Sequence, residues 1–331
     1  MNVPWINASS AHLLLKCPAR WFAGATWYPT SQPGFLNGPV VFEGAATLGT
    51  LVHRAVEQWI HSGKWGDQRA DHSAAQVFND SALSVGAPIG MTRMHASALE
   101  VQLGTLRALL TGSVTDATAE VERENDAYRI RGRIDVLGFG ADRRVVIDVK
   151  SGHTRDRNGG VFGSIRTQMA VYGWLLVANG EPMPQLVVLS LKDGALTLDL
   201  DASFVEQHVC QLIEARDVAL KFPTATPNPD TCQDCPVRRD CAPHWAAVSA
   251  GEITDAVEGR VTRVEESETG RRALIINVHG EESLVTGTER ATTLGVPRAG
   301  DLMKAVRVRN KSYGRWAAGI YSQIWHMSDA G

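Results

Sequence analysis

The sequence has no apolar run long enough to span a membrane, and its first residues lack a basic stretch followed by a hydrophobic segment and a cleavage site. We therefore expect a cytoplasmic protein with no membrane partner. Cysteine is scarce, with five in 331 residues. An odd number in such a chain argues against a disulfide framework and favours metal binding or reduced thiols. The net charge of −3 provides no overall attraction for nucleic acid, which would have to come from local patches.

The composition is that of an ordinary folded protein. Hydrophobic residues make up 44% of the chain and charged residues 21%, which suits a globular protein with a full core. The length favours two or three domains. Because the character of the sequence changes after His244, we expect a first domain over residues 1–245 and a second over 246–331.

Two β-branched runs near the middle of the chain predict a hairpin. Residues 128–139 and 144–150 flank turn material and are typical of adjacent antiparallel strands. A period of two puts Asp148 and Lys150 on one face of the second strand. With Asp135 alongside, two carboxylates could bind a divalent cation, and the ammonium could act on what the cation activates. The alternative is a surface ion pair, which is common for Asp-x-Lys on a strand.

Two predicted helices each carry a pair of polar residues four positions apart, on one helix face. These are His53 with Glu57 in a helix over about residues 46–61, and Gln168 with Tyr172 in a helix over about residues 165–178. Leucines spaced by four, three and four between residues 99 and 110 predict a further helix. A lone histidine on an apolar helix is usually a core residue, and a Gln/Tyr pair is usually a plain helix face. With an apolar strand over 185–191, the pattern indicates an α/β layer architecture.

Three cysteines lie close together in a turn-rich segment, as Cys232-x2-Cys235-x5-Cys241. Thiolates so close in sequence favour a bound metal, and a closed site requires a fourth ligand. Cys17, which like Cys235 precedes a proline, is the best candidate, whereas Cys210 lies among apolar residues of a predicted helix and is expected to be a buried thiol. Four thiolates suit either zinc or a [4Fe–4S] cluster, and the ligand count does not separate the two.

The C-terminal part reads as a series of short strands separated by glycine-bearing turns. The predicted strands cover residues 257–264, 272–278, 282–286, 302–308 and 317–325. Five such strands suggest a small all-β barrel of the oligonucleotide-binding type. Residues 256–328 hold eleven Lys or Arg against eight Asp or Glu, so this part is net positive. Its basic and aromatic cluster comprises Lys304, Arg307, Arg309, Lys311, Tyr313, Arg315 and Trp316. This mixture suits single-stranded nucleic acid, and a charged, solvated strand edge explains it equally well.

Together these motifs resemble the PD-(D/E)XK nuclease superfamily, specifically its RecB-type branch with an iron–sulfur cluster. That branch includes the AddB nuclease domain and CRISPR-associated adaptation nucleases. The resemblance covers roughly residues 7–244. It rests on residues 9–10 through 17–22, on 49–53 with Glu57, on 132–135, on 148–150, on 168–172 and on the three late cysteines. The fold it implies is α/β, a restriction-endonuclease-like mixed central sheet flanked by helices.

The resemblance also implies roles for individual residues. His53, Asp135, Asp148 and the backbone carbonyl of Val149 would hold Mg²⁺ or Mn²⁺. Lys150 would orient or deprotonate the attacking water and stabilise the charged transition state. Gln168 and Tyr172 would position the DNA strand. Glu57 and one of Glu120 or Glu122 are candidates to contact the metal ligands. Cys17, Cys232, Cys235 and Cys241 would hold a [4Fe–4S] cluster, with zinc as the alternative.

The expected function is metal-dependent hydrolysis of DNA, by an exonuclease acting on single-stranded DNA or DNA ends. The resemblance implies that the products carry a 5′-phosphate. The setting would be DNA repair, recombination or phage defence. The sequence has no Gly-x4-Gly-Lys-Ser/Thr motif, so unwinding would come from a helicase or another partner in a defence complex. Two alternatives remain, a non-catalytic DNA-binding scaffold subunit and a nuclease that trims new CRISPR spacers.

Overall fold

The computed structural model describes residues 3–26, 45–63, 65, 67–111, 114–141, 143–232, 235–294, 297–312, 314–319 and 322–327. The chain divides into two compact units. The first comprises Met1–Leu15 and Pro29–Val218, and the second comprises Lys16–Tyr28 and Ala219–Gly331. The boundary predicted after residue 245 thus lies inside the second unit. Within the described ranges, no helix combines the length and apolar character that crossing a membrane requires.

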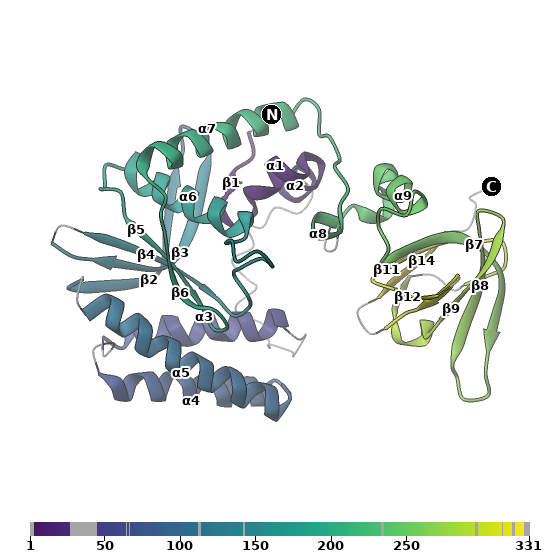
Figure 1. The fold of residues 1–331 in the computed structure, drawn as a ribbon, viewed down its shortest axis with the longest axis horizontal. Helices are drawn as coiled ribbons and strands as arrows, with labels where there is room; N and C mark the ends of the chain where they lie inside the picture. The colour runs from purple at the N-terminus through teal and green to yellow at the C-terminus, as the bar shows by residue number, and fades with distance from the viewer. Residues whose placement is uncertain are drawn as a thin grey trace. The chain divides into compact units, whose positions relative to one another are not determined.

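The first unit is an α/β layer structure with helices on both faces of one mixed sheet (Figure 1). One face is covered by α3 (Ala45–His61), α4 (Gln68–Ser84) and α5 (Ile89–Thr111), and the other by α6 (Gly163–Ala178) and α7 (Ala202–Ala219). The four leucines of α5 that the spacing predicted to share a face are fully buried in the core beneath the sheet. The expected α/β architecture is therefore confirmed for this unit.

The sheet of the first unit is built around its long third strand, β3. Its strands are β1 (Ile6–Asn7), β2 (Asp116–Asn125), β3 (Ile130–Phe139), β4 (Arg144–Lys150), β5 (Gln185–Ser190) and β6 (Gly194–Leu198). One edge of β3 pairs with β2 along its length. The other edge pairs with β1 at its start and with β4 at its end, so the two halves of that edge have different neighbours. β4 continues into a parallel pair with β5.

Strands β3 and β4 separate at one end of their ladder, and we call the opening between them the fork. The last pair in their antiparallel ladder joins Val136 to Ile147, and Asp135 and Asp148 are the next residues on the two strands. Beyond this point the backbone groups of each strand that face the fork need other partners. The N–H of Val149 finds one in the Oδ2 of Asp135, at 2.7 Å. The predicted hairpin is confirmed, and its two acidic residues lie where it opens.

The start of the chain folds into three short helices. A short 3-10 helix, Ala8–Ser10, precedes α1 (His12–Lys16), and α2 (Pro18–Thr26) follows after Cys17. Pro18 is the first residue of α2, a position where its missing N–H costs no hydrogen bond. Cys17 is therefore held in a tight joint between two helices, and it is buried.

The second unit joins α2 to the C-terminal part of the chain. Its other elements are α8 (Pro229–Cys232), α9 (Ala242–Ser249), β7 (Ala256–Glu266), β8 (Arg272–Val278), β9 (Glu281–Thr286), β10 (Thr292–Leu294), β11 (Leu302–Val306), β12 (Arg309–Ser312), β13 (Arg315–Ala317) and β14 (Gln323–Met327). The strands form one sheet in the order β10-β14-β11-β7-β8-β9-β13-β12. The strand predicted over 317–325 is in fact parts of two, β13 and β14. Among the described residues the ends of this order do not pair, so a closed oligonucleotide-binding barrel stays a prediction.

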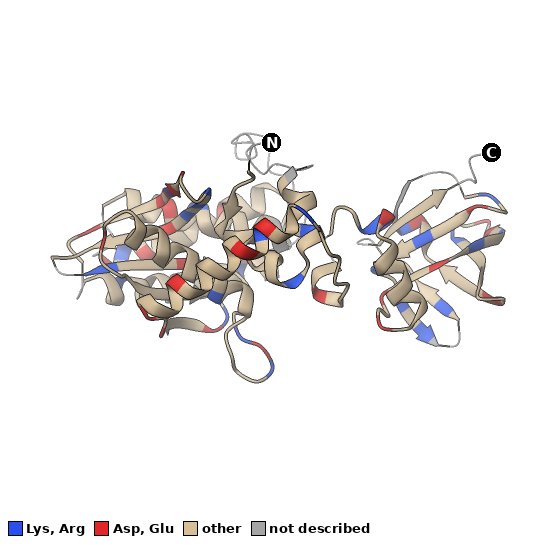
Figure 2. Cartoon of the chain, turned by 90° about the horizontal axis from the view of Figure 1, so that it is seen from above, with Lys and Arg blue, Asp and Glu red and all other residues tan. Residues whose placement is uncertain are grey.

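Residues of the predicted basic cluster have different surroundings in this unit, where Figure 2 marks Lys and Arg in blue. Arg309, Lys311 and Arg315 are exposed on the β12–β13 hairpin. Lys304 instead lies against the protein, with its ammonium 3.3 Å from Glu258 and 4.9 Å from the centre of the Trp245 ring. Tyr313, predicted to belong to the same cluster, lies outside the described residues.

Candidate active site and cysteine site

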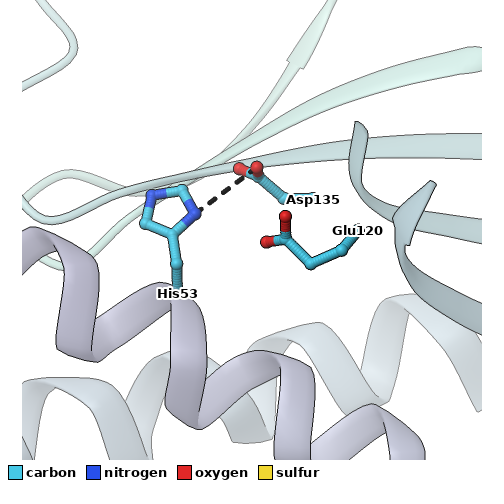
Figure 3. A group of neighbouring side chains, drawn as sticks. All are labelled: His53, Glu120 and Asp135. Atoms are coloured by element: carbon cyan, nitrogen blue, oxygen red, sulfur yellow. Dashed lines mark ion pairs between the residues drawn. The ribbon is translucent and has the colours of Figure 1, made fainter. Parts of the chain in front are cut away.

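The fork in the first unit brings His53 to Asp135 (Figure 3). His53 lies on α3, and its Nδ1 is 3.4 Å from the Oδ1 of Asp135 on β3. Burial by itself lowers the pKa of the imidazole, but the hydrogen bond to Asp135 and the charge of that carboxylate raise the pKa above its usual value. The charges of Asp148 and Lys150 act on the same imidazole. The four residues that the sequence singled out therefore converge.

Glu120 completes this group from β2. Its neighbours Ala119 and Val121 pair with Val136 and Ile134, so Glu120 lies opposite Asp135 in the register. Its φ of 54° is in the left-handed region, which a residue with a side chain rarely adopts within a strand. Ligand atoms of His53, Glu120 and Asp135 all lie within 4.8 Å of one another. Figure 3 shows the three side chains gathered together. The strained backbone of Glu120 thus lies where three potential metal ligands meet.

The carboxylate of Glu120 is held from outside by Arg133, whose Nε is 2.6 Å from Oε2. Burial raises the pKa of Glu120, the Arg133 guanidinium opposes this, and the charge of Asp135 adds to it. Glu122, two positions further along β2, is exposed. Of the two acids that the sequence left open, the structure therefore directs Glu120 into the group. The charge of Glu57 on α3 also acts on Glu120.

Asp148 and Lys150 form a buried ion pair beside this group. The Lys150 ammonium is 3.0 Å and 2.9 Å from the two carboxylate oxygens of Asp148, whose side chain is 0% exposed. Burial raises the pKa of Asp148 to about 6, opposed by Lys150 and reinforced by Asp135. An exposed ion pair, the alternative interpretation from sequence, does not fit a fully buried aspartate. The Asp148 carboxylate of this ion pair therefore lies inside the fork.

Lys150 is also fixed by a chain of hydrogen bonds from α6. Its Nζ donates to the Oε1 of Gln168 at 3.1 Å, the Nε2 of Gln168 donates to the Tyr172 hydroxyl at 2.9 Å, and that hydroxyl donates to the Arg133 carbonyl at 2.6 Å. Gln168 and Tyr172 are both buried. Burial raises the pKa of Tyr172 well above its usual value, as do the charges of Asp148 and Asp135, so the phenol stays a donor. In this chain of hydrogen bonds, Gln168 contacts Lys150 directly and Tyr172 contacts Gln168.

The chemistry of the group fits a divalent cation. Carboxylate oxygens suit Mg²⁺ and Mn²⁺, and an imidazole nitrogen is tolerated by Mn²⁺. When ionised, Glu120, Asp135 and Asp148 carry three negative charges, against two positive charges on Arg133 and Lys150. The site is therefore net negative when His53 is neutral, and a cation would relieve the repulsion between its carboxylates. For Val149 the described contact is that of its N–H with Asp135, and ligation by its carbonyl stays a prediction.

The second unit gathers the four predicted cysteine ligands around a small cavity. Its lining includes Cys17 from the joint before α2, Cys232 at the end of α8, and Cys235 and Cys241 from the turns that follow. Two hydrogen bonds join the segments that line this cavity. The N–H of Ala19 donates to the Thr224 carbonyl at 3.0 Å, and the Arg20 guanidinium donates to the Thr231 carbonyl.

Two thiols of the cavity have raised pKa values. Burial raises the pKa values of Cys232 and Cys235, and the charge of Cys17 adds to both. All five cysteines are free thiols, and Cys210 is exposed on α7, so the prediction that it is buried was wrong. An exposed position on the outer side of α7 does not need an apolar residue, although its sequence neighbours are apolar.

The distances between the sulfurs of the four cysteines can be compared with those around a zinc ion. Among the described residues, no three cysteine sulfurs all lie within 4.8 Å of one another. A tetrahedral zinc site with bonds of about 2.3 Å brings its sulfurs to about 3.8 Å from one another. As placed, no three of these sulfurs therefore meet the spacing around one zinc ion.

Comparison with known proteins shows the family. A model described as the PD-(D/E)XK nuclease superfamily matches residues 6–242, whereas no curated protein matches the chain significantly. The solved structure of protein VC1899 from Vibrio cholerae is similar with 11% identity over 53% of this chain and 55% of its own, at a TM-score of 0.23. This chain thus spans about half the length of that protein. A murine DNA-binding protein solved with double-stranded DNA is similar with 10% identity over 65% of this chain and 96% of its own, at a TM-score of 0.19.

The matched range contains the fork with its acidic and basic residues and all four cysteines of the cavity. It covers more than half of the chain. The chain therefore belongs to the PD-(D/E)XK nuclease superfamily.

Proposed function

We propose that this protein is a divalent-metal-dependent deoxyribonuclease that hydrolyses phosphodiester bonds of single-stranded DNA or DNA ends. The observation that carries the proposal is the meeting of His53, Glu120 and Asp135 next to the buried Asp148–Lys150 pair. Membership of a nuclease superfamily supports the reaction class. The resemblance to RecB-type nucleases extends the proposal to DNA repair, recombination or phage defence.

His53, Asp135, Asp148 and the Val149 carbonyl would hold Mg²⁺ or Mn²⁺, and Glu120 joins them as a ligand. When bound, the ion would supply a Lewis acid for the phosphate and lower the pKa of a bound water. Asp135 has a second task, because its Oδ2 accepts the hydrogen bond from the Val149 N–H. It thereby keeps β3 and β4 at a fixed separation in the fork, which preserves the geometry of the ligands.

Lys150 would act on the phosphate and the attacking water. Its ammonium contacts both carboxylate oxygens of Asp148 and the Oε1 of Gln168, so the positive charge is fixed in the fork. A cation fixed in this way stabilises the negative charge that develops on the phosphate oxygens. Gln168 and Tyr172, expected from the resemblance to position the DNA strand, would act here through Lys150.

The preference for single strands rests on the second unit. The exposed Arg309, Lys311 and Arg315 of the β12–β13 hairpin would follow a phosphate backbone, and Trp316 on β13 could stack on a base. A small all-β module of this kind would guide a strand that a helicase partner has unwound. We retain the oligonucleotide-binding barrel as part of this proposal.

We further propose that Cys17, Cys232, Cys235 and Cys241 hold a [4Fe–4S] cluster. No three of their sulfurs lie as close together as around one zinc ion, and a four-iron cluster separates its thiolates more than one zinc ion does. The cysteines would bind the cluster as thiolates, with release of any thiol protons. The cluster would join α2 to the segment over residues 229–241 and act as a structural brace.

The test uses end-labelled oligonucleotides, one single-stranded and one a blunt duplex of the same sequence. Each is incubated with anaerobically purified protein in Mg²⁺, in Mn²⁺ or in EDTA. We expect cleavage in either metal, faster on the single strand, with 5′-phosphate products and none in EDTA. DNA binding without cleavage in both metals would favour the non-catalytic scaffold. Iron and acid-labile sulfide measured on the same protein test the cluster.

A further inference from the structure

His244 is buried without a hydrogen-bond partner. It is 2% exposed, and neither of its ring nitrogens has a partner among the described residues. A buried polar group without a partner destabilises a protein, and such groups in folded proteins usually have a partner, sometimes a bound ion. His244 therefore needs a partner that the described protein atoms do not supply.

The position of the imidazole indicates where that partner lies. His244 lines the same cavity as the four cysteines. It is in the first turn of α9, three residues after Cys241, which directly precedes that helix and makes no side-chain cap. The ring packs edge-on against Trp245, with centroids 4.8 Å apart and planes at 78°. The Trp245 indole is itself fixed by hydrogen bonds to the carbonyls of Arg238 and Arg239. The histidine is thus held beside the thiols.

The charges around His244 define the chemistry of the partner. Burial, together with the positive charges of Arg238 and Lys304, lowers its pKa to about 4, so the ring is neutral and carries one N–H. Arg20 and Arg238 also line the cavity. A neutral donor among cations and thiols suits an anionic acceptor, and the sulfurs of a cluster held by four thiolates are acceptors of that kind.

We propose that a ring N–H of His244 donates a hydrogen bond to a sulfur of the iron–sulfur cluster and raises its reduction potential. This inference rests on the proposed cluster. Hydrogen bonds to sulfur and nearby positive charge both favour the more negative, reduced form of such a cluster. His244, Arg20 and Arg238 would therefore act together, with His244 as the directional contact. It is a positioning and tuning residue rather than a ligand.

The test compares the full-length protein with three variants. His244→Phe keeps the ring and removes the donor, His244→Gln restores an N–H donor, and His326→Leu is the control. His326 also has two ring nitrogens without partners among the described residues, but it is not part of the cavity lining. Iron and sulfide content, the reduction potential by dye-mediated titration, and pulsed EPR of the reduced cluster in H₂O and D₂O are measured for each.

We expect all four proteins to contain about four irons per chain. The potential should become more negative in His244→Phe, return toward the wild-type value in His244→Gln and stay unchanged in His326→Leu. One exchangeable-proton coupling should disappear in His244→Phe. An unchanged potential and proton spectrum in His244→Phe would overturn the inference. So would nitrogen coupling of a directly ligating imidazole, or iron loss in both His244 variants while both remain folded by circular dichroism.

Failure of the underlying proposal has a different signature. If the wild-type protein contains no iron or sulfide, the cluster is absent and the inference falls with it. If the wild-type cluster is present and His244→Phe matches it in every measurement, only the role of His244 is wrong.

Discussion

The Nζ of Lys150 lies 3.1 Å from the Oε1 of Gln168, which is 18 positions later in the chain and on a different element. Through Gln168 the lysine is connected to the Tyr172 hydroxyl and from there to the Arg133 carbonyl on β3. Helix α6 thus fixes a charged group at the end of β4. The position of the ammonium depends on residues that have no need to touch DNA.

Substituting Gln168 should reduce turnover more than substrate binding. In Gln168→Leu the ammonium keeps Asp148 but loses its second anchor, so we expect kcat to fall roughly tenfold to a hundredfold with little change in KM for DNA. Gln76→Leu is the control, because Gln76 is exposed and bonds Asp80 within its own helix. If KM rises and kcat does not change, Gln168 contacts the DNA strand directly.

Substituting Glu120 should weaken metal binding. Glu120→Gln keeps the shape of the side chain but removes one negative charge from the group, and we expect the Mn²⁺ dissociation constant, measured by calorimetry, to rise at least about tenfold. Glu122→Gln is the matched control, since Glu122 is on the same strand and exposed. Equal Mn²⁺ affinity in the two variants would show that Glu120 is not a ligand.

The stability of the metal-free protein should depend on pH through Asp148. Its folded-state pKa is raised from 3.8 to about 6, so protonation favours the folded state. The contribution is fully present below pH 3.8 and is lost as the pH rises through 6. Asp148→Asn does not titrate. We therefore expect the unfolding free energy of the variant, minus that of the wild type, to increase between pH 4 and pH 8.

The size of this pH effect follows from the raised pKa and is up to about 3 kcal/mol. Urea unfolding in EDTA at several pH values measures it. Added Mg²⁺ should stabilise the wild type more at pH 8 than at pH 5, because the ion binds the ionised carboxylate. A difference between the two proteins that stays constant from pH 4 to pH 8 would refute the assignment.

Gly132 is needed because the ring of Tyr172 packs against its Cα. A Cβ at this position would lie 2.7 Å from Cε1 of Tyr172 and 3.0 Å from the Cβ of Ala8. Gly132→Ala should lower the free energy of unfolding by about 1–3 kcal/mol and reduce nuclease activity by displacing Tyr172. Gly90→Ala, in α5 with no atom within 4 Å of the new Cβ, should have no such effect. Equal stability of the two variants would contradict this packing.

The sequence predicted the elements well where a single periodicity governs them. The leucines of α5 lie on one buried face, and the β-branched runs of β3 and β4 form the paired strands that they predicted. The acidic and basic residues of the fork were also identifiable, since charges within apolar strands are costly unless they interact.

Other features depend on distant parts of the chain. The opening of β3 and β4 after Val136 and Ile147 accompanies the pairing of β1 with the start of β3, from the other end of the domain. The choice of Glu120 over Glu122 depends on a left-handed φ that no local pattern requires. The only sequence signal for Glu120 was the presence of two acids on one strand next to the hairpin. The tie between Gln168 and Lys150 likewise exists only once α6 packs on the sheet.

The most direct test of the central claim is single-turnover cleavage of a labelled single strand in Mn²⁺ by the wild type, Asp148→Ala, Lys150→Ala and the control Lys192→Ala, whose side chain is exposed. We predict that the first two variants lose at least about a hundredfold in cleavage rate, while Lys192→Ala cleaves like the wild type. Equal rates in all four proteins would contradict the assignment of the fork as the active site.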